Sequence, residues 1–229
     1  MADPIVIAVD GPAGSGKSSV SREAARRLGF GYLDTGAVYR ALAWHALHRR
    51  IDTSDAMAVV EALADFDVAV STDPADRTVR VGDAEVTDAI RESAVTGAVS
   101  GVARVPVVRR SLNALFRALI RECARPGIVV EGRDITTVVA PDAPVRILLT
   151  ASEGVRALRR GAELPGADVE QVVAALRRRD GSDAAVAQFR SAAEGVHVID
   201  STDLDFEGTV AAVLAEVDRA AAREVARER

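Results

Sequence analysis

The stretch DGPAGSGKSS, residues 10–19, constrains the fold more than any other part of the chain. An apolar, β-branched run at residues 5–9 precedes it, which is typical of a buried parallel strand. The segment after it has apolar residues at helical spacing and stops at Gly29, a residue type that often follows a helix. A strand, a glycine-rich turn and a helix are therefore predicted at the start of the chain.

Within this stretch, Gly11, Gly16, Lys17 and Ser18 satisfy the pattern G-x-x-x-x-G-K-[ST]. Backbone N–H groups at a helix N-terminus cradle phosphate oxygens, and glycines let the backbone come close. The lysine of such a loop reaches the outer phosphates, and the serine hydroxyl binds Mg²⁺. A chance glycine turn would need neither the strand nor the helix. The residues predicted to bind the phosphates of a nucleotide are Gly11, Pro12, Ala13, Gly14, Ser15, Gly16, Lys17, Ser18 and Ser19.

Lys17 is the only lysine among 29 basic side chains. Such a bias is typical of a GC-rich genome, so the number of arginines indicates nothing about function. A lysine kept at this one position indicates that a slim ammonium is needed there.

Composition excludes several classes of protein. The chain is 48% hydrophobic and 3% aromatic, which predicts an aliphatic core, and its net charge of −5 argues against sequence-independent nucleic-acid binding. Cys123 is the only cysteine, which is typical of a reducing compartment. No window approaches 18 consecutive apolar residues. We expect a soluble cytoplasmic monomer without nucleic-acid or membrane partners.

The remaining pattern predicts strands alternating with helices. Apolar and polar residues alternate at 65–88, which predicts a small antiparallel sheet. The other expected elements are a helix opened by Thr35, helices at about 88–104 and from Pro106 to Pro126, strands at 127–132, 145–151 and 196–200, and helices from Ser152, at 168–179 and from Phe206 onward. This order predicts a three-layer α/β fold with a mostly parallel central sheet.

A phosphate-binding loop alone leaves GTPases, ATPases and small-molecule kinases open. A GTPase usually carries an N-K-x-D motif, which is absent because the only lysine lies in the loop. Motor ATPases usually form larger modules.

Several segments, in order, resemble bacterial cytidylate kinases: DGPAGSGKSS, YLDTGAVYRALA, VSGVARVPVVR, VVEGRDITTVVAPDAPVRILLTAS and RRRDGSD. The similarity runs from Ile5 to about Thr202. It implies a P-loop kinase fold in which the antiparallel sheet belongs to a nucleoside monophosphate-binding insert at about 65–100. A short arginine-rich lid would lie at about 160–186. The implied reaction transfers the γ-phosphoryl group of ATP to CMP or dCMP, with Mg²⁺.

The resemblance also implies the residues that bind the acceptor. They are Thr35, Tyr39, Arg40, Ser100, Arg109, Arg133, Asp134 and Asp183. An aspartate that accepts from the exocyclic amine of cytosine, with an arginine that donates to the ring, suits cytosine and rejects uracil. Other interpretations stay open, because Arg40 fits a solvated helix arginine, Ser100 and Arg109 fit ordinary helix-end residues, and Arg133–Asp134 fits a structural pair.

For catalysis, the resemblance implies Lys17, Arg133, Arg160 and Arg179, with Arg156 facing adenine. Residues 177–179 also fit a solvated helix end. Carboxylates at Glu131, Asp10 or Asp34 would hold Mg²⁺ through water. No general base is needed, since the acceptor phosphate is already an anionic nucleophile. The histidines at 45, 48 and 197 lack metal-ligand spacing.

Two positions depart from the family pattern. Val186 stands where the family usually has a lid arginine, for which Arg190 is a possible substitute, and Thr136 stands where it usually has glycine. These departures leave two alternatives open. One is a kinase of a modified cytidine nucleotide, and the other is a weakly active nucleotide-binding module. The preference between ribose and deoxyribose is also open.

Overall fold

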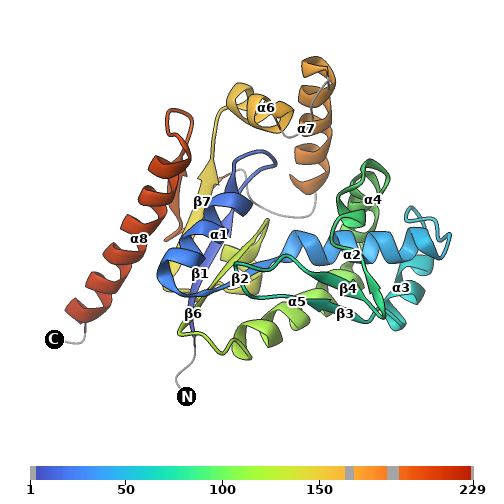
Figure 1. The fold of residues 1–229 in the computed structure, drawn as a ribbon, viewed down its shortest axis with the longest axis horizontal. Coiled ribbons are helices and arrows are strands. Elements are labelled where there is room, and N and C mark those ends of the chain that lie inside the picture. Colours follow the sequence, from blue (N-terminus) through green and yellow to red (C-terminus); the bar gives the residue numbers. More distant parts are fainter. Residues whose placement is uncertain (1–3, 163–167, 185–190, 228–229) are drawn as a thin grey trace.

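The structure, a computed structural model, describes residues 4–162, 168–184 and 191–227. Its centre is a five-stranded sheet in the order β2-β6-β1-β7-β8 (Figure 1). The strands are β1 (Ile5–Asp10), β2 (Gly31–Asp34), β6 (Gly127–Gly132), β7 (Val145–Thr150) and β8 (His197–Asp200). All four neighbouring pairs run parallel, which confirms the predicted parallel α/β fold.

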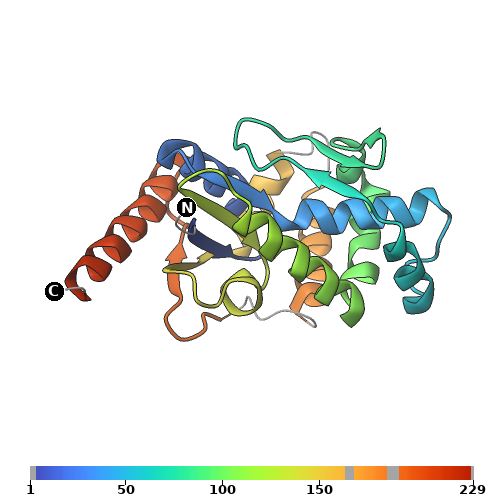
Figure 2. The same cartoon turned by 90° about the horizontal axis from the view of Figure 1, so that it is seen from below.

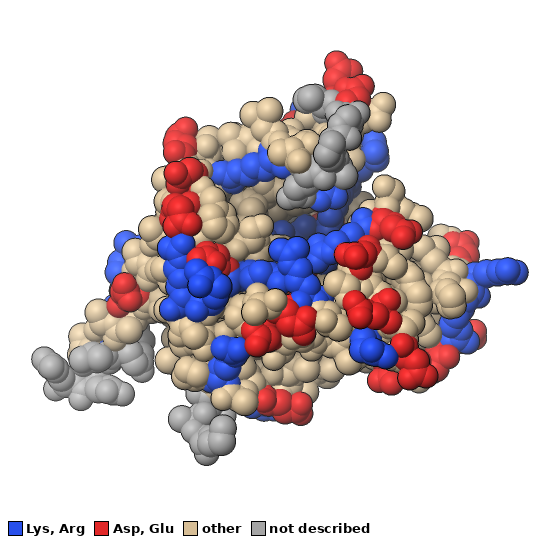
Figure 3. Space-filling view, in the orientation of Figure 1, with Lys and Arg blue, Asp and Glu red and all other residues tan. Residues whose placement is uncertain are grey.

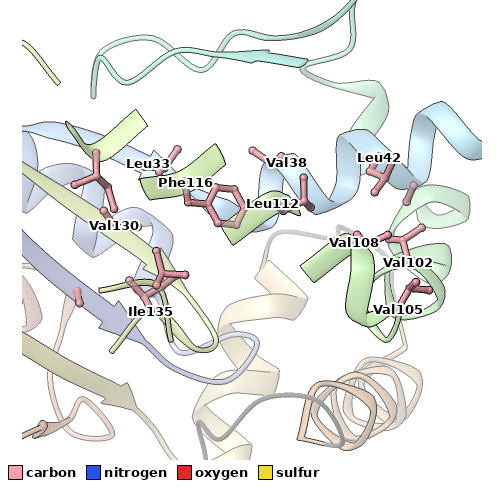
Figure 4. Close-up of a cluster of buried hydrophobic side chains, with 14 of the residues drawn as sticks. Leu33, Val38, Leu42, Val102, Val105, Val108, Leu112, Phe116, Val130 and Ile135 are labelled. Carbon is pink, nitrogen blue, oxygen red and sulfur yellow. The ribbon is translucent and has the colours of Figure 1, made fainter. Parts of the chain in front are cut away.

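Helices cover both faces of this sheet because its strands are apolar on both sides. On β6, Val129 packs in a cluster with helices α1 (Lys17–Leu28) and α8 (Phe206–Arg227). Its neighbour Val130 points the other way, into a cluster with α2 (Thr35–His48), α4 (Ser93–Ala103) and α5 (Pro106–Arg121), shown in Figure 4. Figure 2 shows α8 and α5 on opposite sides of the sheet. Within the described residues, every helix is too short or too polar to cross a bilayer.

A second sheet interrupts the helical layer, as the alternating pattern predicts. It has three antiparallel strands in the order β3-β4-β5. They are β3 (Val68–Val70), β4 (Val79–Val81) and β5 (Ala84–Glu85), preceded by helix α3 (Ala56–Ala64). Val79 and Val81 pack with Ala37 and Ala41 of α2, so this sheet is fixed to the helix that follows β2.

Helices α6 (Glu153–Ala162) and α7 (Val169–Ala184) form a separate pair above the β1–α1 turn (Figure 1). Their contact with the rest of the chain includes a small apolar cluster in which Ala157, Val172 and Leu176 surround Ala13. The tip of the glycine-rich turn is therefore also part of the α6–α7 packing.

Several helix boundaries differ from the sequence-based prediction. Asp34, not Thr35, caps α2, because its carboxylate accepts from the Ala37 N–H at 2.8 Å. The helix expected at 88–104 is split into a 3₁₀ turn (Ala89–Arg91) and α4, because Glu92 is extended with ψ 150°.

Two further elements were not predicted correctly. Helix α7 does not end at Arg179 but continues to Ala184, through Gly181. Residues Ile135–Val139 form a single π-helical turn after β6, whose wide hydrogen bonds leave no periodic signal in so short a segment.

Candidate active site

The glycine-rich turn leaves the N-terminus of α1 uncapped by any side chain among the described residues. Gly14 (φ 77°) and Gly16 (φ 84°) take the left-handed conformation that a residue with a Cβ adopts at a cost. A Cβ on Gly14 would also lie 2.9 Å from the Arg156 carbonyl oxygen. The free N–H groups and the positive end of the helix dipole therefore face the cleft, as a phosphate site requires.

Lys17 extends from the first residue of α1 back over this turn. Its ammonium donates to the Pro12 carbonyl at 3.2 Å, and the residue is buried. Burial, and then the nearby Arg133 guanidinium, lowers the pKa of Lys17 to about 7. A bound phosphate would reverse this shift, because it supplies a negative charge beside the ammonium.

Ser18 and Glu131 lie together at the base of the cleft. The Ser18 hydroxyl donates to Glu131 Oε1 at 2.6 Å, and the Tyr32 hydroxyl donates to the same oxygen at 3.2 Å. Burial and then the Asp34 charge raise the pKa of Glu131. A buried carboxylate and a hydroxyl are oxygen ligands of the kind that Mg²⁺ takes, and Mg²⁺ binds mostly to water and substrate phosphates. These residues therefore fit Mg²⁺ at Ser18, with Glu131 behind it.

The main cleft has a volume of about 450 Å³ and lies at the carboxyl ends of the strands, where ligands bind in such sheets. Figure 3 shows basic side chains gathered across this hollowed region below the α6–α7 pair. Nine basic residues line it: Lys17, Arg22, Arg40, Arg77, Arg91, Arg109, Arg133, Arg160 and Arg179. Four acidic residues do so: Asp34, Glu131, Asp134 and Asp183. The cleft thus carries an excess of five positive charges in a chain of net charge −5.

Three ion pairs between described residues line the cleft. Arg40 pairs with Asp34 at 2.9 Å, and Arg133 pairs with Asp183 at 2.8 Å. Arg109 of α5 pairs with Asp134, which follows β6. These contacts bring five of the predicted acceptor-binding side chains into one cavity from distant parts of the chain, together with Asp34, a carboxylate expected to hold Mg²⁺ through water. Arg179 lies near Arg133, and burial followed by that neighbour lowers the pKa of Arg179 to about 10, so it stays cationic at neutral pH.

The end of the cleft around Arg109 and Asp134 is partly apolar. Val99 and Ala103 line it from α4, and the ring of Tyr39 packs 6.1 Å from that of Phe116. The Tyr39 hydroxyl is buried without a described partner, and burial raises the pKa of Tyr39 to about 12. A partly apolar lining beside an arginine and a carboxylate suits a planar heterocycle with polar edges.

Some predicted residues lie outside this cavity. Ser100 lies on α4 between two lining residues but is not itself one of them. Gly11, Pro12 and Ser15 form the back of the turn, while Ala13, Gly14, Gly16 and Ser19 line the cleft. Val186 and Arg190 lie outside the described residues, so the lost arginine contact and its substitute stay predictions.

Arg156 is not among the residues that line this cleft, and its expected contact with adenine stays a prediction. Its guanidinium pairs with Asp180 of α7 at 2.6 Å and donates to the Ala13 carbonyl at 2.9 Å. Asp180 also accepts from the Ala13 N–H at 3.1 Å. Both backbone groups of Ala13 are thus bonded to the α6–α7 pair, and we call Ala13, Arg156 and Asp180 the loop clamp.

Asp10 is not placed to hold Mg²⁺ through water. Its carboxylate accepts from the Ile135 N–H at 2.8 Å, and from the Thr136 N–H at 2.9 Å and hydroxyl at 2.6 Å. These bonds fix the π-helical turn against the end of β1. Thr136, where the family usually has glycine, is therefore a buried residue that donates to Asp10 and does not line the cleft.

Four arginines of the site region were missed in the sequence. Arg159 donates to the Ser15 carbonyl at 3.3 Å and to the Ser201 hydroxyl at 2.9 Å, which ties the turn to the loop after β8. Arg22, Arg77 and Arg91 line the cleft. The chain has many arginines, and nothing in the local sequence distinguishes these four from the others. They come together only because the chain folds.

The uncapped glycine turn, the parallel sheet and the arginine-lined cleft define a P-loop phosphotransferase. Comparison with known proteins narrows this class. The model of the cytidylate kinase family matches residues 7–219. The chain belongs to the cytidylate kinase family.

Proteins named cytidylate kinase from three bacteria illustrate the similarity. The one from Cutibacterium acnes is 44% identical over 213 residues, covering 92% of this chain and 95% of that protein. The one from Rhodococcus jostii is 46% identical over 216 residues, covering 92% and 93%. The one from Mycolicibacterium paratuberculosis is 46% identical over 211 residues, covering 89% and 91%.

Among solved structures, an uncharacterized protein from Eubacterium ventriosum has a TM-score of 0.53 at 12% identity, over 93% of this chain and 98% of that one. This similarity concerns the fold.

Proposed function

We propose that the protein transfers the γ-phosphoryl group of ATP to CMP or dCMP, giving ADP and the cytidine diphosphate. The observation that carries the proposal is the layout of the cleft. One cleft holds the uncapped α1 N-terminus, the Arg109–Asp134 pair and seven further arginines. Family membership supports the same reaction.

In this proposal the base of the acceptor lies beside Tyr39. Asp134 accepts from the exocyclic amine of cytosine, and Arg109 donates to the ring. Uracil presents the opposite hydrogen-bond polarity there and would leave these buried groups unpaired, at a cost of about 1–3 kcal/mol for each unmade bond. Asp183 is placed to accept from a ribose hydroxyl.

The acceptor phosphate then lies between Arg40 and Arg133, in line with the γ-phosphate of ATP. Its oxygen forms the new bond to the γ-phosphorus as the bond to the β-phosphate oxygen breaks, and no proton needs to be removed first. Lys17, Arg160 and Arg179 stabilise charge on the transferred group. Mg²⁺, when bound at Ser18, would neutralise phosphate charge. Catalysis is therefore positioning and electrostatic stabilisation.

A coupled assay of ADP formation with CMP, dCMP, UMP and AMP tests the proposal. Turnover with CMP or dCMP well above that with UMP and AMP is expected. Equal turnover with all four would contradict the assigned base contacts, and no turnover with any acceptor would contradict the proposed reaction. Comparing KM for CMP and dCMP in wild type and Asp183→Ala then reports on the ribose contact.

A further inference from the structure

Three arginines of the cleft have no role in the reaction proposed above. Arg22 comes from α1, Arg77 from the loop between β3 and β4, and Arg91 from the 3₁₀ turn before α4. None of them forms an ion pair with a described residue, whereas Arg40, Arg109 and Arg133 each have a carboxylate partner.

These three side chains lie in the part of the cleft around Arg40. Arg91 interacts electrostatically with Arg40, Asp34, Arg77 and Arg22, and partial burial followed by Arg40 lowers its pKa. The other cationic group, around Lys17, Arg133 and Arg179, interacts with Asp183 and Glu131 instead. Two cationic groups therefore meet at Arg40, one over the phosphate-binding loop and one at the mouth.

Arg22, Arg77 and Arg91, which we call the mouth group, are partly open to solvent, and one of them is fixed in position. Arg77 and Arg91 are exposed. The Arg22 guanidinium lies over the Tyr32 ring, 4.7 Å from its centroid, and is held there without a carboxylate. Of the charged groups named above as interacting with Arg91, only Asp34 is acidic, and it already pairs with Arg40. Such an unneutralised group attracts a multiply charged anion at its mouth.

We infer that Arg22, Arg77 and Arg91 form a capture site for the phosphate group of the acceptor nucleotide, which they draw into the cleft and pass to Arg40. This inference rests on the proposed function, since a nucleoside monophosphate is the anion that enters here. A cleft lined by one sign of charge raises the local concentration and the association rate of an oppositely charged ligand by about 10- to 1,000-fold. Because the three residues do not touch the transferred group, they affect capture and not turnover.

The test compares Arg77→Gln/Arg91→Gln with Arg80→Gln, which removes one positive charge from the neighbouring β4. Arg80 is exposed, bonds to the Asp83 carbonyl and does not line the cleft. At about 20 mM salt the double variant is expected to lose about ten-fold in kcat/KM for CMP, with kcat and KM for ATP unchanged. At about 500 mM salt the difference should nearly vanish, because the Debye length falls to about 4 Å. Arg80→Gln should match wild type.

The inference is overturned if the double variant keeps the wild-type kcat/KM at low salt, or if its loss is in kcat and independent of salt. Affinity for cytidine, which has no phosphate, should not change.

A second measurement separates this inference from the proposed function. Inorganic phosphate is titrated into the ADP-loaded protein by calorimetry, a readout that needs no turnover. Weaker, less salt-dependent phosphate binding in the double variant than in Arg80→Gln supports the capture site even if CMP proves not to be the acceptor. Equal phosphate affinity in the two variants overturns it.

Discussion

Lys17 is the single ammonium among 29 basic side chains, and its surroundings explain why arginine does not replace it. The side chain is buried, and its nitrogen lies 3.2 Å from the Pro12 carbonyl oxygen. Backbone N–H groups of the glycine-rich turn surround this position. A guanidinium is wider, planar and directs its donors differently. This position therefore favours the compact ammonium of lysine over the guanidinium of arginine.

We predict that Lys17→Arg folds normally but loses phosphoryl transfer. Its guanidinium can extend into the cleft, so the unfolding midpoint should stay within a few degrees of wild type. Loss of a charge aimed at the transferred group should lower kcat by about 100-fold or more. The coupled ADP assay and thermal unfolding measure the two quantities. Retained activity would show that the lone lysine is only a matter of composition.

Proton uptake on nucleotide binding follows from the lowered pKa of Lys17. In the nucleotide-free protein this pKa is about 7, below its ordinary value of 10.5, so at about pH 8 most molecules hold Lys17 neutral. A bound phosphate favours the ammonium, and binding should take up close to one proton per ADP. Calorimetry without divalent ions, in buffers of different ionisation enthalpy, counts that proton. Lys17→Met should abolish the uptake, and proton release by wild type would contradict the prediction.

Among the secondary-structure elements, those stabilised by residues close in sequence could be predicted. Those stabilised by residues far away in sequence could not. The β1 strand, the glycine turn and α1 form a local unit with strong signals at Gly16 and Gly29, and the structure has all three. The π-helical turn at Ile135–Val139 exists because Asp10, far away in sequence, binds its N–H groups. No local pattern could have predicted it.

The residues of the candidate site also differ in whether the local sequence could predict their roles. The motif residues around Lys17 and Ser18 could be placed from their spacing alone. The partner of Arg156 could not, because Asp180 and Ala13 meet it only after α6 and α7 fold over the turn. Arg77 and Arg91 reach the cleft only through the path of the chain around the small antiparallel sheet.

The loop clamp should couple Arg156 and Asp180 energetically. Both side chains are 11% exposed, so removing one takes the opposite charge away from a buried partner. We expect a double-mutant cycle of Arg156→Ala and Asp180→Ala, measured by urea unfolding, to give an interaction energy of about 1–3 kcal/mol.

The pair between Arg177 and Glu153 is a matched control, since it also joins α6 to α7 but is 68% and 42% exposed. Its coupling should stay below about 1 kcal/mol. If the two cycles gave equal values, the loop clamp would not hold Ala13 as described.

At the scale of the whole molecule, charge is separated between the cleft and the rest of the surface. The cleft carries an excess of five positive charges, although the chain has a net charge of −5. The central sheet, the loop between β3 and β4, and the α6–α7 pair each contribute part of the lining. The fold thereby gathers arginines that are scattered along the chain into one site for two phosphorylated nucleotides.

The proposed recognition of cytosine by Asp134 and Arg109 is tested by the ratio of kcat/KM for CMP to kcat/KM for UMP. We expect a ratio of about 100 or more in the wild-type protein. In Asp134→Asn the ratio should fall towards one, mainly through loss of activity with CMP. Wild-type protein that uses UMP as well as CMP, or an Asp134→Asn variant that keeps the wild-type ratio, would contradict it.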